Sequence, residues 1–230
     1  MKAVRDSDVY TVKRENEQEF LLLYGVCAQV ARYSNAYLRL TQVGFGREGR
    51  VLARAALEHA VTAQWVYLTK GGMDRFRISA GRNHKQYYSD ISAWSELKEL
   101  TDLVEELPDL DGDGLPNFLR GILRKLDQNH FLETSYSTLS QVVHVTHAAS
   151  LDFLDHIDGE YHIKYEQDDP WEYQTAYVLA VSCMLVSWLI ARLTDDEEEL
   201  AYLDRMSDEL ILPMSLADAL DDDVRRHDEG

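Results

Sequence analysis

Hydrophobic residues recur at intervals of three and four along most of this 230-residue chain, which is the period of an α-helix. The pattern is clear in residues 8–42, where Leu23, Cys27 and Val30 fall on one face. Gly44 then interrupts it, as a glycine just past the end of a helix does. The sequence therefore predicts a long first helix over 8–42.

The same periodicity predicts several further helices. They span 47–69, 73–107 with Gly81 as the candidate break, 116–128, 133–157, an apolar helix starting at Asp168–Pro170, and a short helix capped by Thr194–Glu197, with 159–169 as an irregular or extended link. Only 12 glycines and 4 prolines occur, which argues against an all-β fold because tight turns consume both. We expect an all-α fold: a single antiparallel bundle of about six or seven helices over 1–217, followed by an acidic, flexible tail over 218–230.

One stretch of 17 residues without a charge, Thr175–Ala191, requires a membrane test. A membrane-spanning helix needs about 20 apolar residues, and no cluster of Lys or Arg flanks this stretch. We therefore predict a buried central helix and no membrane association. The polar N-terminus, Met1–Asp6, does not resemble a signal peptide, so we expect a cytoplasmic protein.

The formal net charge of −18 restricts the function classes. Such a surface repels phosphate backbones, so general coating of DNA or RNA is not expected, although a local basic strip is compatible with it. Cys27 and Cys183 lie far apart in apolar helical stretches and have no zinc-binding spacing. Buried free thiols are therefore the simplest interpretation.

Residues 109–114, Asp-Leu-Asp-Gly-Asp-Gly, match the front half of a calcium-binding loop, with oxygen ligands at positions one, three and five and Gly at six. Position twelve is Arg120, so a cation replaces the bidentate Glu that completes such a site, and Pro116 stiffens the loop. We interpret the segment as an acidic connector and predict no metal site.

Charged residues occupy the predicted inner face of the second helix. At 100° per residue, Arg54 and Glu58 lie about 40° apart, and Val61 and Trp65 share their face. Buried charges are costly unless they are paired. Two interpretations fit this face: an internal salt bridge, or a functional site.

Polar residues also interrupt the apolar face of the fifth predicted helix. Tyr136, Ser140, His144 and His147 are spaced four, four and three apart and fall within about 80° of one another. They are either core side chains satisfied by neighbouring carbonyls and carboxylates, or a polar seam that meets the charged pair of the second helix.

Joined in this way, the two sets would form a pocket suited to three chemistries. Glu58, His144 and His147 can bind a metal, although the Glu-x-x-His pairs of di-iron bundles are missing. His144 can act as a general base while Arg54 stabilises an anion, as a metal-independent ribonuclease requires. The pocket can also hold a small anionic ligand, or none. The candidate catalytic residues are Arg54, Glu58 and His144, and the candidate ligand-binding residues are Tyr136, Ser140 and His147; we expect neither a metal nor a cofactor.

Two motifs resemble a bacterial all-helical family of unknown function. The first is Arg54-Ala-Ala-Leu-Glu58, followed by the aromatic Trp65-Val-Tyr67-Leu68, and the second is Tyr136-x-x-Leu-Ser140-x-x-x-His144. The resemblance covers roughly residues 15–195, judged by helix order. It implies a helical bundle with an Arg/Glu/Ser/His cluster and leaves the activity open.

A looser similarity is to the HEPN superfamily, helical domains that often act as RNases in toxin–antitoxin and phage-defence systems. Its signature of Arg, four to six residues and then His occurs at Arg54 to His59, Arg77 to His84 and Arg124 to His130. In none of the three is the Arg followed by the customary Asn, Asp or His, and Arg54 and His59 would point about 140° apart on a helix. We therefore transfer no HEPN catalytic role to these positions.

Two functions are left open. One is a regulatory or interaction module, in a stress or phage-defence setting, whose polar seam holds the bundle in register. The other is a metal-independent HEPN-like RNase with a pocket of Arg54, Glu58, Ser140 and His144; the net charge weighs against it, because a nuclease must approach phosphates. Aromatic residues on the first and third predicted helices favour a homodimer, with another protein as the alternative partner, and core packing is the other interpretation of the same residues. They are Tyr33, Tyr37, Tyr87, Tyr88 and Trp94.

Overall fold

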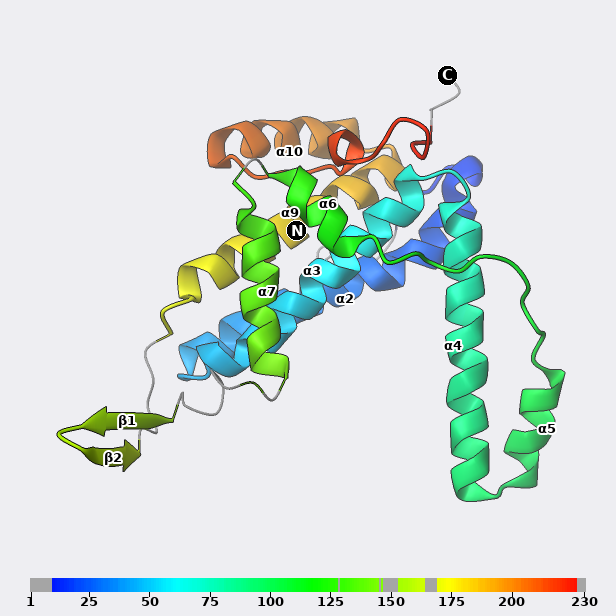
Figure 1. The fold of residues 1–230 in the computed structure, drawn as a ribbon. Coiled ribbons are helices and arrows are strands. Elements are labelled where there is room, and N and C mark those ends of the chain that lie inside the picture. The colour runs from blue at the N-terminus through cyan, green and yellow to red at the C-terminus, as the bar shows by residue number, and fades with distance from the viewer. Residues whose placement is uncertain (1–9, 128, 145, 147–152, 164–168, 227–230) are drawn as a thin grey trace.

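Eight α-helices account for most of the residues that the computed structural model describes, which are 10–127, 129–144, 146, 153–163 and 169–226 (Figure 1). In chain order the elements are η1 (Arg14–Asn16), α2 (Glu17–Gln42), α3 (Gly46–Leu68), α4 (Gly72–Ser95), α5 (Lys98–Glu106), α6 (Leu119–Leu126), α7 (Phe131–Val143), β1 (Leu154–Ile157), β2 (Glu160–Ile163), α9 (Glu172–Thr194), α10 (Glu197–Leu210) and η2 (Ala217–Ala219). The all-α class predicted from the helical periodicity is confirmed, with one small β-hairpin added.

Helices α2, α3 and α9 pack against one another and form the centre of the bundle (Figure 1). α2 contributes Leu23, Cys27 and Val30, the face that the periodicity predicts, and all three are fully buried. α9 is long and apolar enough to cross a membrane, with a mean hydropathy of 1.9, and 67% of that apolar window is buried inside the bundle. The apolar stretch therefore forms the buried central helix that was predicted. A helix with apolar residues on every side is stable where other helices cover it on every side.

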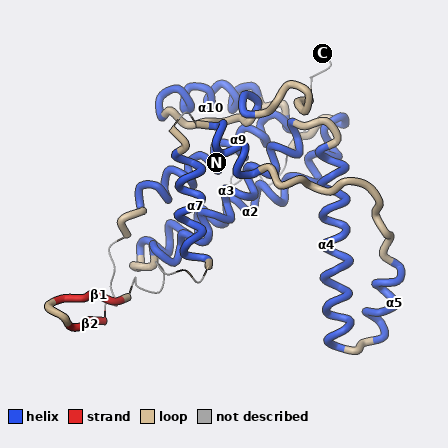
Figure 2. Tube along the Cα trace, viewed as in Figure 1, coloured by secondary structure: helices blue, strands red, loops and turns tan. Residues whose placement is uncertain are grey.

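α4 leaves the bundle as a long arm, and α5 folds back beside it (Figures 1 and 2). Gly81 does not break α4. It lies where Leu110 of the returning chain crosses the helix, and a Cβ added at Gly81 would collide with the Leu110 side chain. The helix ends instead at Glu96, whose left-handed backbone (φ 54°) reverses the chain. The region predicted as one helix over 73–107 is therefore two helices with their break at Glu96.

The helix predicted over 133–157 is wrong at its far end, where residues 154–157 form a strand, and residues 145 and 147–152 lie outside the described residues. α7 ends at Val143, in a stretch rich in β-branched residues that lower helix propensity. Further on, β1 and β2 pair antiparallel, with Leu154 opposite Ile163. Asp158 and Gly159 form the turn with φ values of 52° and 86°. Asp-Gly favours such two-residue hairpin loops because both turn residues need a positive φ.

The first helix begins at Glu17, nine residues later than predicted, and the remaining element boundaries lie within a few residues of their predicted positions. α2 begins at Glu17 after the short η1, and the predicted cap at residues 6–8 lies outside the described residues. Asp196 caps α10 as predicted, because its carboxylate accepts the backbone N–H of Glu199 at 3.0 Å.

The described part of the C-terminal segment, up to residue 226, lies against the bundle. Gln64 of α3 is fully buried; its amide donates to the carbonyls of Leu185 (2.8 Å) and Met214 (2.7 Å) and accepts the N–H of Leu216 (2.8 Å). Arg225, within the predicted tail, forms an isolated β-bridge with the residue that follows α3. The segment predicted as a tail therefore begins with residues that contact the core.

Candidate functional site

One face of α3 carries a row of charged side chains. Arg47, Arg50, Arg54 and Glu58 follow one another at intervals of three and four, so they share this face. Arg50 forms an ion pair with Asp169, and the two side chains are only 6% and 12% exposed. The Asp169 carboxylate also accepts the backbone N–H of Trp171, the residue just before α9 (3.0 Å). Because a buried charge must be paired, this ion pair fixes the start of α9 against α3.

Arg54 and Glu58 form the salt bridge that the sequence allows, with 2.9 Å between Nη2 and Oε1, and Tyr136 of α7 joins them. The Tyr136 hydroxyl donates to Glu58 Oε1 (2.6 Å) and accepts from Arg54 Nη2 (3.1 Å). The Arg54 guanidinium also lies over the Tyr136 ring, 5.3 Å from its centroid. Burial and the hydrogen bond to Glu58 raise the pKa of Tyr136, so its hydroxyl stays protonated at neutral pH. We call these three residues the α3–α7 cluster.

Two further members of the predicted polar seam, Ser140 and His144, do not join this cluster. The Ser140 hydroxyl donates to the carbonyl of Tyr136, one turn earlier in α7 (2.7 Å). His144 lies past the end of the helix with an extended backbone and an exposed side chain. Among the described residues, no hydrogen bond or ion pair joins the His144 ring to the cluster. The remaining member of the seam, His147, lies outside the described residues.

Within the α3–α7 cluster the Tyr136 hydroxyl is fully used, whereas Arg54 Nε is buried without a hydrogen-bond partner among the described residues. The Tyr136 hydroxyl donates its one hydrogen to Glu58 and accepts a hydrogen bond from Arg54. It therefore has no hydrogen left to donate to a ligand. Within the described ranges, no group of three or more His, Cys, Asp or Glu side chains is placed to hold a metal ion. The arrangement can hold α3 and α7 in register.

The calcium-like segment at residues 109–114 binds protein cations. Lys85 of α4 donates to the Asp109 carboxylate (2.6 Å), which lowers the pKa of Asp109. Arg82 donates to the carbonyls of Leu110 (2.9 Å) and Gly112 (2.8 Å). Of the three predicted oxygen ligands, Asp109 is paired with a lysine, and Arg82 binds carbonyls at loop positions two and four, which are not calcium-ligand positions. These contacts tie the segment to α4, as a connector would be.

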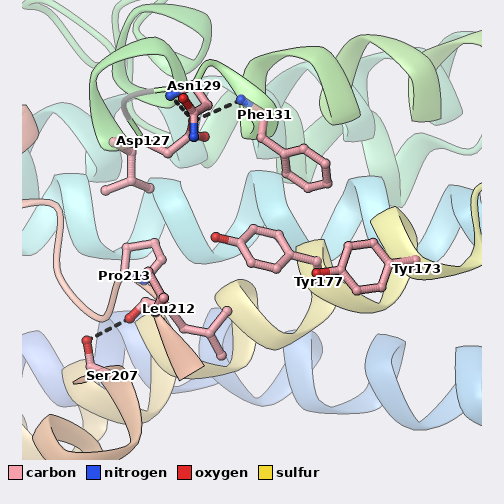
Figure 3. A pocket seen from close by; sticks show the side chains of 10 residues that line it. Asp127, Asn129, Phe131, Tyr173, Tyr177, Ser207, Leu212 and Pro213 are labelled. Carbon is pink, nitrogen blue, oxygen red and sulfur yellow. Dashed lines mark hydrogen bonds between the residues drawn. The ribbon is translucent and has the colours of Figure 1, made fainter. Parts of the chain in front are cut away.

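A groove of about 670 Å³ lies where the turn between α6 and α7 faces α9 and the C-terminal end of α10 (Figure 3). We call it the α9–α10 groove. Its aromatic lining is Phe131, Tyr173 and Tyr177, its aliphatic lining is Leu126, Ile211, Leu212 and Pro213, and its polar lining is Asp127, Asn129 and Ser207. Figure 3 shows the Tyr177 hydroxyl pointing between the α6–α7 turn and the segment after α10. No sequence motif predicts this site, because its residues come from separate segments of the chain.

A model of a family of unknown function, DUF5677, matches residues 20–161, which is more than half of the chain. The chain belongs to this family. The part matched in this DUF5677 chain runs from α2 into β2 and includes Arg54, Glu58, Tyr136, Ser140 and His144. No significant match was found among curated proteins or among solved structures.

The DUF5677 span also contains the arm, where the structure separates the predicted aromatic faces into two kinds. Tyr37 of α2 is buried against Gly49, and Tyr33 packs edge-on against His59, so neither forms an exposed face on the first helix. On α4, by contrast, Trp94 is 85% exposed and Tyr87 is 59% exposed. Of the aromatic residues predicted to form an exposed face, Tyr87 and Trp94 are therefore the exposed ones, and both lie on the arm.

Proposed function

We propose that this DUF5677 chain is a non-enzymatic interaction module that pairs with a second copy of itself through the α4–α5 arm. The observation that carries the proposal is the exposure of Trp94 near the tip of the arm. Tyr87 lies seven residues earlier, about two helical turns and so on nearly the same face. Leu97 follows in the turn and is also exposed. Clustered exposed apolar side chains of this size are typical of interaction surfaces.

Charge favours a second copy as the partner. α4 contains four basic and two acidic residues, whereas α5 contains one basic and four acidic residues. In a twofold pair the same surface serves both copies, so α4 of one arm can lie against α5 of the other. Elsewhere, copies with a net charge of −18 repel each other. Residues 91–95 at the tip carry no charge, so approach is opposed least there.

The α3–α7 cluster supports a structural role for the polar residues in such a module. Arg54, Glu58 and Tyr136 bond to one another across a helix interface. A bonded polar group inside a bundle disfavours alternative registers, because a slip of one helix would leave charges unpaired. The cluster would then keep the body in one arrangement while the arm makes contact.

Sedimentation velocity of the full chain over a wide concentration range tests the proposal. We expect a reversible dimer for the wild type and a monomer for the double variant Tyr87→Ser/Trp94→Ser. Tyr161→Ser, which removes an exposed Tyr from the β-hairpin, is the matched control and should dimerise as the wild type does. A wild type that stays monomeric, or a dimer that survives the double substitution, would overturn the proposal.

A metal-independent HEPN-like RNase is the second candidate. The observation in its favour is that Arg54 and Glu58 do meet Tyr136 across the α3–α7 interface. We rank it second because the proposed base, His144, makes no hydrogen bond or ion pair with this cluster within the described part of the chain, and its side chain is exposed. Expression of the wild type and His144→Ala in cells, with RNA integrity and growth as readouts, separates the two: RNA loss that depends on His144 would establish the nuclease. The stress or phage-defence setting stays a prediction, which the identity of neighbouring genes tests.

A further inference from the structure

The α9–α10 groove has three aromatic walls. Phe131, at the start of α7, meets Tyr177 of α9 edge to face, with ring centroids 5.1 Å apart and an interplanar angle of 87°. Tyr173 lies one turn before Tyr177 on α9 and is 73% exposed at the mouth of the groove (Figure 3). Aromatic faces attract cations because the ring quadrupole is negative above and below the plane.

The formal charge in the groove is also negative. Asp127 is the one charged side chain among the described lining residues, so an anionic ligand would meet a carboxylate and no cation. The pKa of Tyr177 is raised, first by burial and then by the nearby Asp127 charge, which places a negative potential at the ring edge. The net charge of −18 acts in the same direction.

The acceptor atoms of Asp127 are largely occupied. One carboxylate oxygen accepts the N–H groups of Asn129 (3.0 Å) and Phe131 (2.8 Å), and the other accepts that of Leu132 (2.7 Å). A primary ammonium has three N–H donors that need acceptors once water is removed. A methylated ammonium has few or none, so it needs only the aromatic faces and the negative charge of Asp127, whose acceptor atoms are already in use.

The mouth of the groove holds a strained residue. Ile211 follows α10 with a left-handed backbone (φ 53°), and its side chain is 83% exposed. A β-branched residue rarely adopts this conformation, and such strain concentrates at binding sites. The exposed Ile211 side chain gives a bound ligand an apolar edge opposite Tyr173.

We propose that the α9–α10 groove binds a methylated ammonium group, packed against Phe131, Tyr173 and Tyr177 with its charge toward Asp127. The group could be carried by a free quaternary amine or by a trimethylated lysine side chain. The site does not depend on pairing through the arm, so it stands or falls separately from the proposed function.

Calorimetric titration of the full chain with choline and with its uncharged isostere 3,3-dimethylbutan-1-ol tests the site. The two probes have the same shape, so their difference reports the charge. We expect saturable binding of choline, with the isostere about tenfold weaker because it forms no cation–π contact. Tyr173→Ala and Tyr177→Ala should abolish choline binding, whereas Tyr177→Phe, which keeps the ring, should retain it.

Tyr202→Ala, an exposed tyrosine of α10 outside the groove, is the control and should bind choline as the wild type does. Peptides with trimethylated or unmodified lysine distinguish the sources: tighter binding of the trimethylated peptide than of choline assigns the ligand to a protein, and the reverse assigns it to a free amine. Absence of saturable binding by both cations, equal binding of choline and its isostere, or binding that survives Tyr173→Ala/Tyr177→Ala in a folded protein would each overturn the proposal.

Discussion

The side chain of Gln64 makes three hydrogen bonds in the core, one with α9 and two with residues 214–216. Gln64→Leu keeps the packing volume but leaves the Leu216 N–H and the Met214 carbonyl without their partner. We expect the free energy of unfolding to fall by about 3 kcal/mol, since an unsatisfied buried polar group costs about 1–3 kcal/mol. Guanidinium chloride unfolding followed by circular dichroism measures this.

Gln42→Leu, at the exposed end of α2, is the matched control for Gln64→Leu. A surface change of this kind shifts stability by less than about 0.5 kcal/mol. Equal losses in both variants would show that Gln64 has no special role in holding the C-terminal segment.

The hydroxyl of Tyr136 links Arg54 to Glu58. Tyr136→Phe removes two hydrogen bonds to charged groups and leaves the salt bridge. The partners keep some access to water, so we expect a loss of about 1.5 kcal/mol in the free energy of unfolding, the low end for bonds to charged groups. Denaturant unfolding measures it, with the exposed Tyr202→Phe as reference; an unchanged midpoint would mean that the cluster contributes nothing to stability.

Contacts between side chains that are close in sequence could be predicted, and contacts between distant residues could not. Arg54 and Glu58 are four residues apart on one helix, so their contact follows from helical geometry alone. His144 shares that spacing relative to Ser140, but its place depends on where α7 ends, which the motif does not encode. Arg50 meets Asp169 from 119 residues away, and no local pattern joins the two.

The C-terminal end of α10 carries strain at Ile211. Ile211→Gly relieves the left-handed backbone, which costs a side chain about 1–2 kcal/mol, and adds some chain entropy to the unfolded state. The exposed side chain buries little surface, so we expect a net gain of about 0.5–1 kcal/mol in the free energy of unfolding. Thermal and denaturant unfolding measure the gain.

Leu210→Gly, one residue earlier and still in the helix, is a control of opposite sign. It should destabilise the protein by about 1 kcal/mol, because glycine in a helix interior is unfavourable. If both variants lose stability, Ile211 is not strained in solution.

The spacing of hydrophobic residues predicted which segments are helical. It did not predict where most of them end, because the ends depend on single residues. The Asp158–Gly159 pair turns a region with helical spacing into a hairpin. Glu96 ends α4 although it is no glycine, because the arm reverses there and α5 packs back on α4. Gly81, which reads as a helix breaker, serves close packing instead.

In the whole molecule, the charged and the apolar features occupy different parts of the fold. The core of α2, α3 and α9 is mostly apolar, and many of its polar groups bond to carbonyls or to each other, whereas the buried Ser187 hydroxyl has no hydrogen-bond partner among the described residues. The arm and the α9–α10 groove lie on different elements, so the proposed second copy and the proposed ligand would not compete for one surface (Figure 1). The bundle body would then support two separate surfaces.

Alkaline pH should lower the stability of the folded chain. Burial raises the pKa of Tyr37, Tyr136 and Tyr177 above the ordinary value of 10.0, and that of the Cys27 thiol to about 12. Above pH 10 the unfolded chain releases these protons while the folded chain still holds them. The folded state then binds more protons than the unfolded state, so the free energy of unfolding falls as pH rises. The stability that these groups contribute is fully present below their pKa values in the unfolded chain.

Denaturant unfolding at a series of alkaline pH values measures this slope, and tyrosinate absorbance of the native protein reports the delayed ionisation. The double variant Tyr136→Phe/Tyr177→Phe cannot release these two protons, so its stability should fall less steeply above pH 10 than that of the wild type. Tyr161→Phe, in the exposed hairpin, should keep the wild-type slope. Parallel slopes for all three proteins would mean that these two tyrosines do not control alkaline unfolding. Deprotonation of the lysines, which makes the net charge of −18 more negative, would then account for the slope.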